Sequence, residues 1–115
     1  MTIFRLFAAI FFAAAIYHLI AVVVPGLSIP GAHWRHALFV GIDFLFAGLL
    51  LWRPRWLVFP FFVLTLWSLY SHGAHAWNWW HFERRVDWLS LGVVIVLPLM
   101  LTILILERAR QSPGA

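Results

Sequence analysis

Long runs of apolar residues, separated by short polar or helix-breaking segments, make up most of this chain. Each run is about 20 residues long, which is the length that an α-helix needs to cross the hydrocarbon core of a bilayer. The separators are Pro25-Gly26, Arg53-Pro54-Arg55 and the aromatic and charged segment 77–85, all typical of turns or loops. The pattern therefore predicts transmembrane helices over about residues 4–24, 34–52, 55–76 and 88–106.

The connections between these runs indicate how the helices are arranged. The Arg53–Arg55 turn is too short to join anything but antiparallel neighbours, and Asp87 is a typical N-cap for the last helix. Small antiparallel bundles turn their polar stripes inward. We expect an all-α integral membrane protein, an antiparallel four-transmembrane-helix bundle that forms one domain over residues 1–107. Residues 108–115 are expected to form a disordered cytoplasmic tail.

Composition supports a lipid environment and excludes several classes of protein. Hydrophobic residues make up 64% of the chain and charged residues only 10%, too few to cover the surface of a soluble domain. Cysteine is absent, which leaves no thiolate for a metal or a disulfide. The basic residues are dispersed arginines and no phosphate-binding or RNA-binding motif is present, so we expect no nucleic-acid partner.

Tryptophan and arginine positions predict depth and orientation in the bilayer. Seven of the 8 tryptophans lie near the ends of the predicted helices, as in the aromatic belts of membrane proteins. Five of the 8 arginines lie on the side of the two termini. By the positive-inside rule we expect both termini in the cytoplasm. We expect the membrane to be the bacterial inner membrane.

All 6 histidines then fall in the outer, non-cytoplasmic half of the bundle. Thr65, Ser68, His72 and His75 share one face of the third helix. At 1.5 Å per residue, His18, Asp43 and His72 reach similar depths, roughly 6 to 10 Å below the outer edge. An ionisable side chain at such a depth is costly and usually functional, which makes Asp43 the hardest of them to explain as structural.

Imidazoles from several helices together with one carboxylate are a ligand set for zinc, copper or iron, and facing histidines also bind haem. The sequence predicts a transition-metal or haem site, in a redox or metal-handling role. The predicted ligands are His18, Asp43, His72 and His75. Additional candidate ligands are His33, His36 and His81, and supporting polar groups are Ser68, Ser90 and Asp87. No nucleophile elbow or oxyanion donor accompanies these residues, so we assign no catalytic residue and leave open whether the protein is an enzyme.

Other interpretations of the same residues remain open. His33, His36 and His81 are also typical of residues that contact headgroups, and His72 with His75 could be a hydrogen-bonded packing pair. Asp43 could be neutralised by Arg35 or by a histidine for structural reasons. Two other functions are consistent with the pattern. One is an accessory, pigment-contacting or cofactor-contacting subunit of a larger membrane complex. The other is a proton-coupled carrier with Asp43 and His72 as a relay. The candidate protein partners are other membrane subunits or further copies of this chain in a homo-oligomer.

Overall fold

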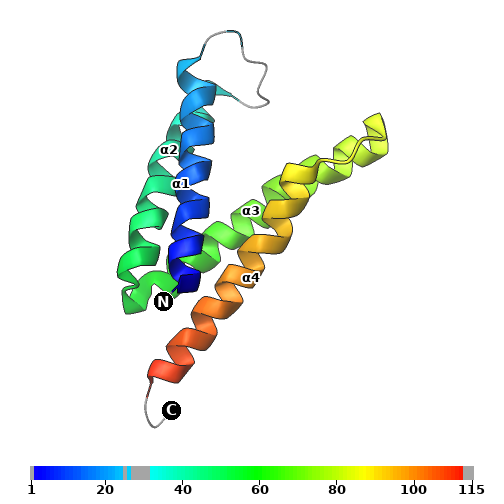
Figure 1. The fold of residues 1–115 in the computed structure, drawn as a ribbon. Coiled ribbons are helices and arrows are strands. Elements are labelled where there is room, and N and C mark those ends of the chain that lie inside the picture. The colour runs from blue at the N-terminus through cyan, green and yellow to red at the C-terminus, as the bar shows by residue number, and fades with distance from the viewer. Residues whose placement is uncertain (1, 25, 27–31, 113–115) are drawn as a thin grey trace. The chain divides into compact units, whose positions relative to one another are not determined.

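The computed structural model describes residues 2–24, 26 and 32–112 (Figure 1). The regular elements of these residues are all helical. They are α1 (Thr2–Val23), α2 (His33–Trp52), a 3-10 turn η1 (Arg55–Leu57), α3 (Val58–Asn78), a π-helical turn η2 (Trp79–Glu83) and α4 (Trp88–Gln111). Four helical segments, α1, α2, the run Arg55–Glu83 and α4, are long and apolar enough to cross a membrane. The all-α class and the four membrane-length helices are thus confirmed.

The chain divides into two compact units, residues 1–54 and 55–115. The first contains α1 and α2 and is called the N-terminal hairpin. The second contains α3 and α4 and is called the C-terminal hairpin. Each hairpin is described by itself, and the assembly of both into one antiparallel bundle and one domain stays a prediction.

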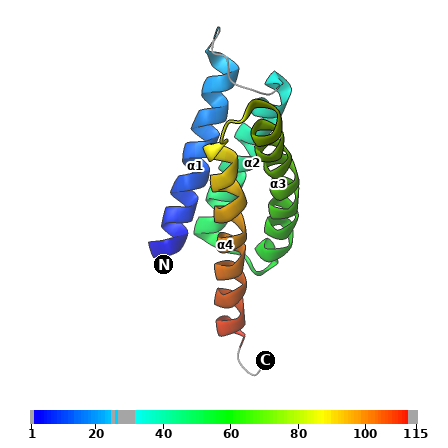
Figure 2. The ribbon, with the colours of Figure 1, turned by 90° about the vertical axis from the view of Figure 1, so that its right-hand side faces the viewer.

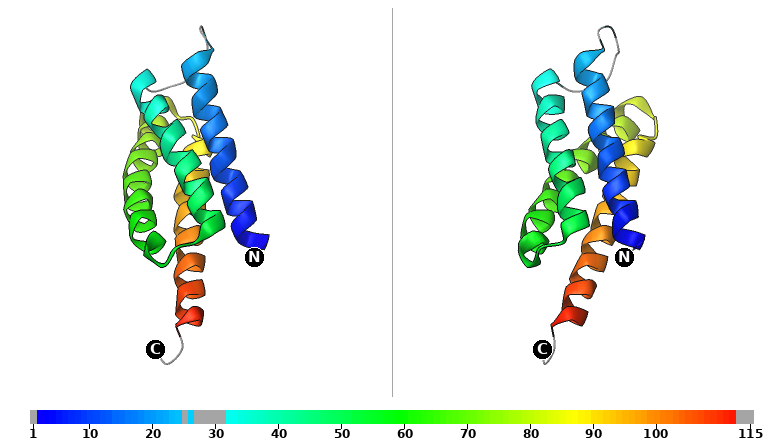
Figure 3. Two further views of the ribbon diagram at one scale, coloured as in Figure 1. Left: turned by 90° about the vertical axis from the view of Figure 1, so that its left-hand side faces the viewer. Right: turned by 60° about the vertical axis from the view of Figure 1, so that its left-hand side comes forward.

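In the N-terminal hairpin, α1 and α2 pack side by side and run in opposite directions (Figures 1 and 3). Apolar side chains recur every three or four residues along the buried face of α1, which is the spacing of one helix face. Phe11 of α1 stacks on Phe46 of α2 with the ring centroids 5.8 Å apart. This contact holds the middle of the two helices together. The buried apolar residues of the hairpin are Phe4, Phe7, Ala8, Phe11, Ala15, Ala21, Phe46, Ala47, Leu49 and Leu50.

The end of α2 is closed by Arg53, whose backbone adopts the left-handed conformation with φ 57°. Its N–H donates to the carbonyl of Leu49 at 2.6 Å, which satisfies one of the carbonyls that a helix end leaves unpaired. The Arg53 guanidinium lies 4.9 Å from the centre of the Phe4 ring, a cation–π distance. The turn therefore also ties the start of α1 to the end of α2.

In the C-terminal hairpin, α3 and α4 pack against each other (Figure 2). Asp87 caps α4 by accepting a hydrogen bond from the backbone N–H of Ser90 at 3.1 Å, as its position in the sequence predicts. The helical run that begins at Arg55 continues through η2 to Glu83. The segment 77–83 is therefore helical, whereas its aromatic and charged composition predicted a loop. The helix continues through it because no proline or glycine interrupts it.

The C-terminal end of α4 also differs from the prediction. Residues 108–111 form the last turn of α4, so the prediction of a disordered tail is wrong for them. Arg108 donates to the side-chain oxygen of Gln111 at 2.9 Å, and Gln111 donates to Glu107 at 2.8 Å. Such pairs at i, i+3 and i, i+4 stabilise a helix, and cations suit its C-terminal dipole. Residues 113–115 of the predicted tail lie outside the described residues.

Candidate functional site

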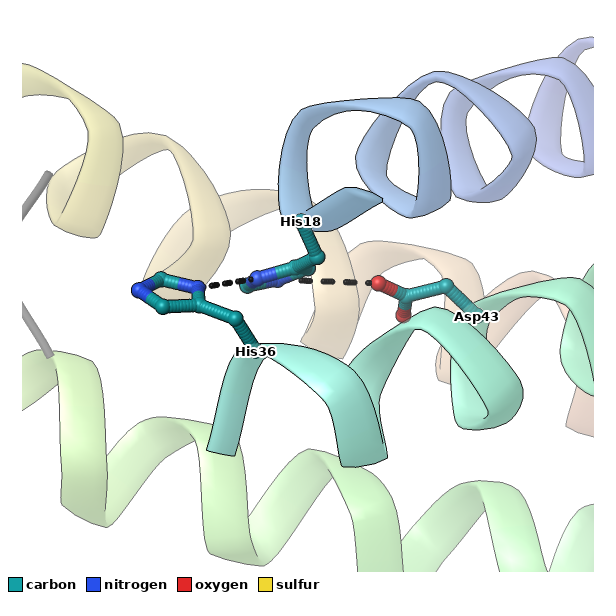
Figure 4. A network of polar contacts seen from close by, with 3 residues as sticks. All are labelled: His18, His36 and Asp43. Carbon is teal, nitrogen blue, oxygen red and sulfur yellow. Dashed lines mark hydrogen bonds and ion pairs between the residues drawn. The ribbon is translucent and has the colours of Figure 1, made fainter. Parts of the chain in front are cut away.

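The N-terminal hairpin brings His18, His36 and Asp43 together (Figure 4). His36 and Asp43 lie seven residues, about two turns, apart on the same face of α2, and His18 faces both from α1. The Nδ1 atoms of His18 and His36 lie 2.8 Å apart, a hydrogen-bond distance. On the other side of the same ring, His18 Nε2 lies 3.7 Å from Asp43 Oδ2. His18 is therefore the middle of a chain that runs from His36 to Asp43, the His–Asp chain.

The contact between the two imidazoles restricts where their protons lie. A hydrogen bond between two Nδ1 atoms needs a proton on one of them and a lone pair on the other. When Asp43 is ionised, the proton of neutral His18 is best placed on Nε2, facing the carboxylate. His18 Nδ1 then accepts the hydrogen bond, and His36 Nδ1–H donates it. The order of donors therefore follows from the charge of Asp43.

Aromatic rings hold the His18 ring in this orientation. Phe39 of α2 stacks on it with the centroids 5.4 Å apart and 27° between the planes. The rings of Tyr17 and His18 meet edge to face, with the centroids 5.3 Å apart and 75° between the planes. Packing of this kind limits rotation of the imidazole about its χ2 angle, and it keeps the two nitrogens pointing at their separate partners. The face of Phe39 also attracts an imidazolium, should His18 become charged.

Asp43 and His36 are both buried, with exposed fractions of 6% and 7%. A buried carboxylate is costly unless it is paired or protonated. The ion-pair partner of Asp43 is His18. Of the two structural interpretations left open by the sequence, the structure therefore shows pairing with a histidine and not with Arg35. Because imidazole can be neutral or protonated, the total charge of the His18–Asp43 pair depends on how many protons the pair holds.

The C-terminal hairpin holds a second chain of polar contacts, formed by His72, Ser90 and Asp87. The Ser90 hydroxyl donates to Asp87 Oδ2 at 2.6 Å, and His72 Nδ1 lies 3.0 Å from the Ser90 oxygen. Because the hydroxyl proton is directed to Asp87, the Ser90 oxygen can only accept from His72 Nδ1–H. The neutral form of His72 therefore carries its lone pair on Nε2. In a hydrolase triad the serine proton faces the histidine instead, so this chain does not have that arrangement.

The remaining predicted residues lie in different surroundings. His33, His75 and His81 are exposed, and the His81 ring stacks on Trp77 with the centroids 3.9 Å apart. Thr65 donates to the carbonyl of Phe61 at 2.8 Å. Ser68 is buried in α3.

The predicted metal ligands divide between the two hairpins. His18 and Asp43 lie in the N-terminal hairpin with His36, which the sequence offered as an additional ligand, and His72 and His75 lie in the C-terminal hairpin. Across residues 2–24, 26 and 32–112, no group of three or more histidine, aspartate or glutamate side chains is arranged to hold a metal ion. A single site that contains all four predicted ligands stays a prediction.

Sequence reasoning missed two parts of the site. It placed His18 and Asp43 at similar depths, but it did not identify His18 as the residue between His36 and Asp43, because the His18–His36 contact joins residues 18 apart on different helices. It also missed Phe39, although a residue three positions after His36 on a helix lies close to the same face.

We compared the chain with protein-family models, with curated proteins and with solved structures, and no match was found in any of the three. The function is therefore argued from the site alone.

Proposed function

We propose that this protein is a proton-coupled membrane transport protein in which His36, His18 and Asp43 pass a proton into the hydrocarbon region. The observation that carries the proposal is that the two nitrogens of His18 face different partners, His36 Nδ1 at 2.8 Å and Asp43 Oδ2 at 3.7 Å. Imidazole can accept a proton at one nitrogen and release another from the second, which makes it suited to a relay. Intramembrane histidines and carboxylates are typical of proton pathways.

The relay proceeds by three proton movements. It begins with Asp43 ionised, His18 protonated on Nε2 and His36 protonated on Nδ1. A proton from water binds His36 Nε2 and makes this ring an imidazolium. His36 then gives its Nδ1 proton to His18 Nδ1, and His18 gives its Nε2 proton to the Asp43 carboxylate. The products are a neutral Asp43, His18 protonated on Nδ1 and His36 protonated on Nε2, so one proton has been taken up and the carboxylate charge removed.

The last transfer controls the relay. A separation of 3.7 Å is longer than a hydrogen bond, so the His18 ring and Asp43 must approach each other before the proton moves. Along α2, the distance from His36 to Asp43 is roughly 10 Å at 1.5 Å per residue. The proton therefore moves from the start of α2 to a level about one third of the way across the hydrocarbon core.

The proposal includes an arrangement in the membrane. Both hairpins would pack as one antiparallel four-helix bundle, with the termini in the cytoplasm and the start of α2 at the outer face. The excess of arginine on the side of the termini supports this orientation. Protons would then enter the His–Asp chain from the outside.

Purified protein in proteoliposomes that contain a pH-sensitive dye tests the proposal. A pH gradient, with valinomycin and potassium to clamp the voltage, should drive a proton flux that empty vesicles lack. Asp43→Asn and His18→Gln should each reduce it roughly 100-fold, the lower end of what removal of a proton-transfer group costs. His33→Gln is the matched control, because this exposed histidine lies outside the His–Asp chain. Equal fluxes for wild type, both variants and control would refute the relay.

A metal is the second candidate occupant, because imidazole and carboxylate are the ligand types of zinc, copper and iron(II). The convergence of His18 Nδ1 and His36 Nδ1 favours these two as its ligands. However, bonds of about 2.0 Å to one ion place tetrahedral nitrogens about 3.3 Å apart, so the rings would have to separate from 2.8 Å. Elemental analysis and a visible spectrum of the protein used in the flux assay distinguish a metal site from a proton relay. Stoichiometric metal or a haem band that is lost in both His18→Gln and His36→Gln would favour the metal over the proton.

A further inference from the structure

The segment that runs from the end of α3 through η2 to the start of α4 exposes large aromatic side chains next to two arginines. We call this surface the aromatic turn. It contains Trp77, Trp80, Phe82 and Trp88, which are all at least half exposed, together with Trp79, Arg84 and Arg85. Phe82 alone is 83% exposed. So much exposed aromatic surface on one turn needs a partner that is partly apolar.

The lengths of the helices indicate where this turn lies. At 1.5 Å per residue, α1 with 22 residues and α2 with 20 residues are about 33 and 30 Å long, the thickness of the hydrocarbon core alone. The helical run Arg55–Glu83 has 29 residues and is about 43 Å long. That length matches the 40 to 45 Å of a whole bilayer with its headgroups. The aromatic turn at the end of this run therefore reaches the level of the lipid phosphates.

The two arginines of the turn offer binding groups for an anion. The Arg85 guanidinium lies 5.3 Å from the centre of the Trp79 ring and 3.6 Å from the carboxylate of Glu83, so ring and carboxylate together restrict its position. Arg84 adds a second, exposed guanidinium. The other nearby acid, Asp87, uses both of its oxygens on Ser90. The four charges of the turn sum to zero, but no ion pair among the described residues involves Arg84, so its guanidinium can bind an anion, and guanidinium groups bind phosphate through two hydrogen bonds at once.

We propose that the aromatic turn binds an anionic phospholipid, with Arg84 and Arg85 on the phosphate and the exposed indole and phenyl rings against the glycerol and upper acyl chains. Tryptophan is suited to this boundary because its ring is apolar and its N–H is polar. A soluble phosphate would satisfy the arginines but leave the rings exposed, and a zwitterionic lipid would bring its own cation to the site. This inference involves the C-terminal hairpin and is independent of the relay in the N-terminal one.

Thermal unfolding in an uncharged detergent, with and without added lipid, tests the proposal. Phosphatidylglycerol should raise the Tm of the wild type by about 4 °C, and phosphatidylcholine should raise it by less than half as much. In Arg84→Gln/Arg85→Gln the two lipids should become equivalent, and Arg84→Gln alone should give an intermediate response. The matched control is Arg55→Gln/Arg110→Gln, which removes the same charge from exposed positions at the other end of this hairpin and should keep the wild-type preference.

Soluble headgroup chemistry is tested in parallel. Inorganic phosphate and glycerophosphoglycerol, at the concentration of the lipid, should leave the Tm unchanged. A full shift with either of them would show an anion site that does not recognise lipid and would overturn the proposal. An equal response of the wild type to both lipids, or an unchanged preference in Arg84→Gln/Arg85→Gln, would do the same. Native mass spectrometry that counts retained phosphatidylglycerol gives a readout that does not depend on stability.

Discussion

The Nδ1 atoms of His18 and His36 lie 2.8 Å apart, on two helices that run in opposite directions. At this distance one ring donates its Nδ1–H to the Nδ1 lone pair of the other. If His18 is neutral and its Nδ1 accepts this hydrogen bond, its own proton lies on Nε2. The other nitrogen of His18, Nε2, faces the buried Asp43, and this arrangement is the basis of the proposed proton relay.

The tautomers of the histidine pair are a direct consequence of the geometry. With Asp43 ionised, His18 should carry its proton on Nε2 and His36 on Nδ1. Protein labelled with ¹⁵N-histidine distinguishes the two forms, because protonated and bare ring nitrogens resonate far apart. In Asp43→Asn the preference of His18 for an Nε2 proton should weaken. An unchanged His18 spectrum in that variant would contradict the assigned donor order.

Phe39 should act as a positioning residue, because its ring stacks on His18 at 5.4 Å. Phe39→Leu keeps the side chain apolar but removes the flat surface, so the proton flux should fall while the protein stays folded. Phe39→Tyr keeps the ring and should restore most of the flux. If both variants conduct as the wild type does, the stacking has no part in the relay. A shift of the His18 ¹⁵N signals in Phe39→Leu would separate lost orientation from a merely looser core.

We expect the Asp43 carboxylate to lower the free energy of unfolding, or leave it unchanged, and to be required for the proton flux. Replacement of a buried ionic pair by apolar residues is often neutral or stabilising by about 1 to 4 kcal/mol. Because His18 can stay neutral once its partner is gone, Asp43→Leu leaves no uncompensated charge. We expect an unfolding free energy in detergent at or above that of the wild type, with the flux abolished. A loss of about 3 kcal/mol or more would instead show that the carboxylate is there for structure.

Ser90 should matter for the stability of the C-terminal hairpin. It is 3% exposed, and its hydroxyl lies between Asp87 Oδ2 at 2.6 Å and His72 Nδ1 at 3.0 Å. Ser90→Ala leaves both groups without this partner and should lower the unfolding free energy by about 2 kcal/mol. Thr102→Ala is the control, since its exposed hydroxyl bonds only the carbonyl of Pro98 and its loss should cost less than about 0.5 kcal/mol. Ser90→Thr, which keeps the hydroxyl, should recover most of the difference.

Arg84 is in the left-handed backbone region with φ 51°, where a residue with a Cβ is strained. Arg84→Gly removes this strain, and it should raise the Tm measured without lipid, by the equivalent of about 1 kcal/mol. The same variant should respond less to phosphatidylglycerol because it lacks a guanidinium. A destabilised Arg84→Gly protein would indicate that the arginine side chain makes stabilising contacts within the protein itself.

Much of the fold is predictable from the local sequence. Apolar runs of membrane length, broken by Pro25-Gly26 and by the Arg53–Arg55 turn, are sufficient to place α1 and α2, because every backbone group in lipid must be satisfied within its own helix. The ends of α3 and α4 were harder to predict. The segment 77–83 is aromatic and charged and residues 108–111 are polar, and such composition does not distinguish an interfacial or solvated helix from a loop when no helix breaker is present.

The residues of the site were predictable as a set of candidates, because histidine and aspartate at membrane depth are costly wherever they point. Their grouping was not. Whether His18 meets Asp43 or His72 depends on the rotation of α1 about its axis and on the helix that packs beside it, and apolar sequence on all sides of a helix does not specify either. Only the packing of α1 on α2 places one imidazole between a second imidazole and a carboxylate. That placement turns three isolated polar residues into the connected chain on which the proposed relay depends.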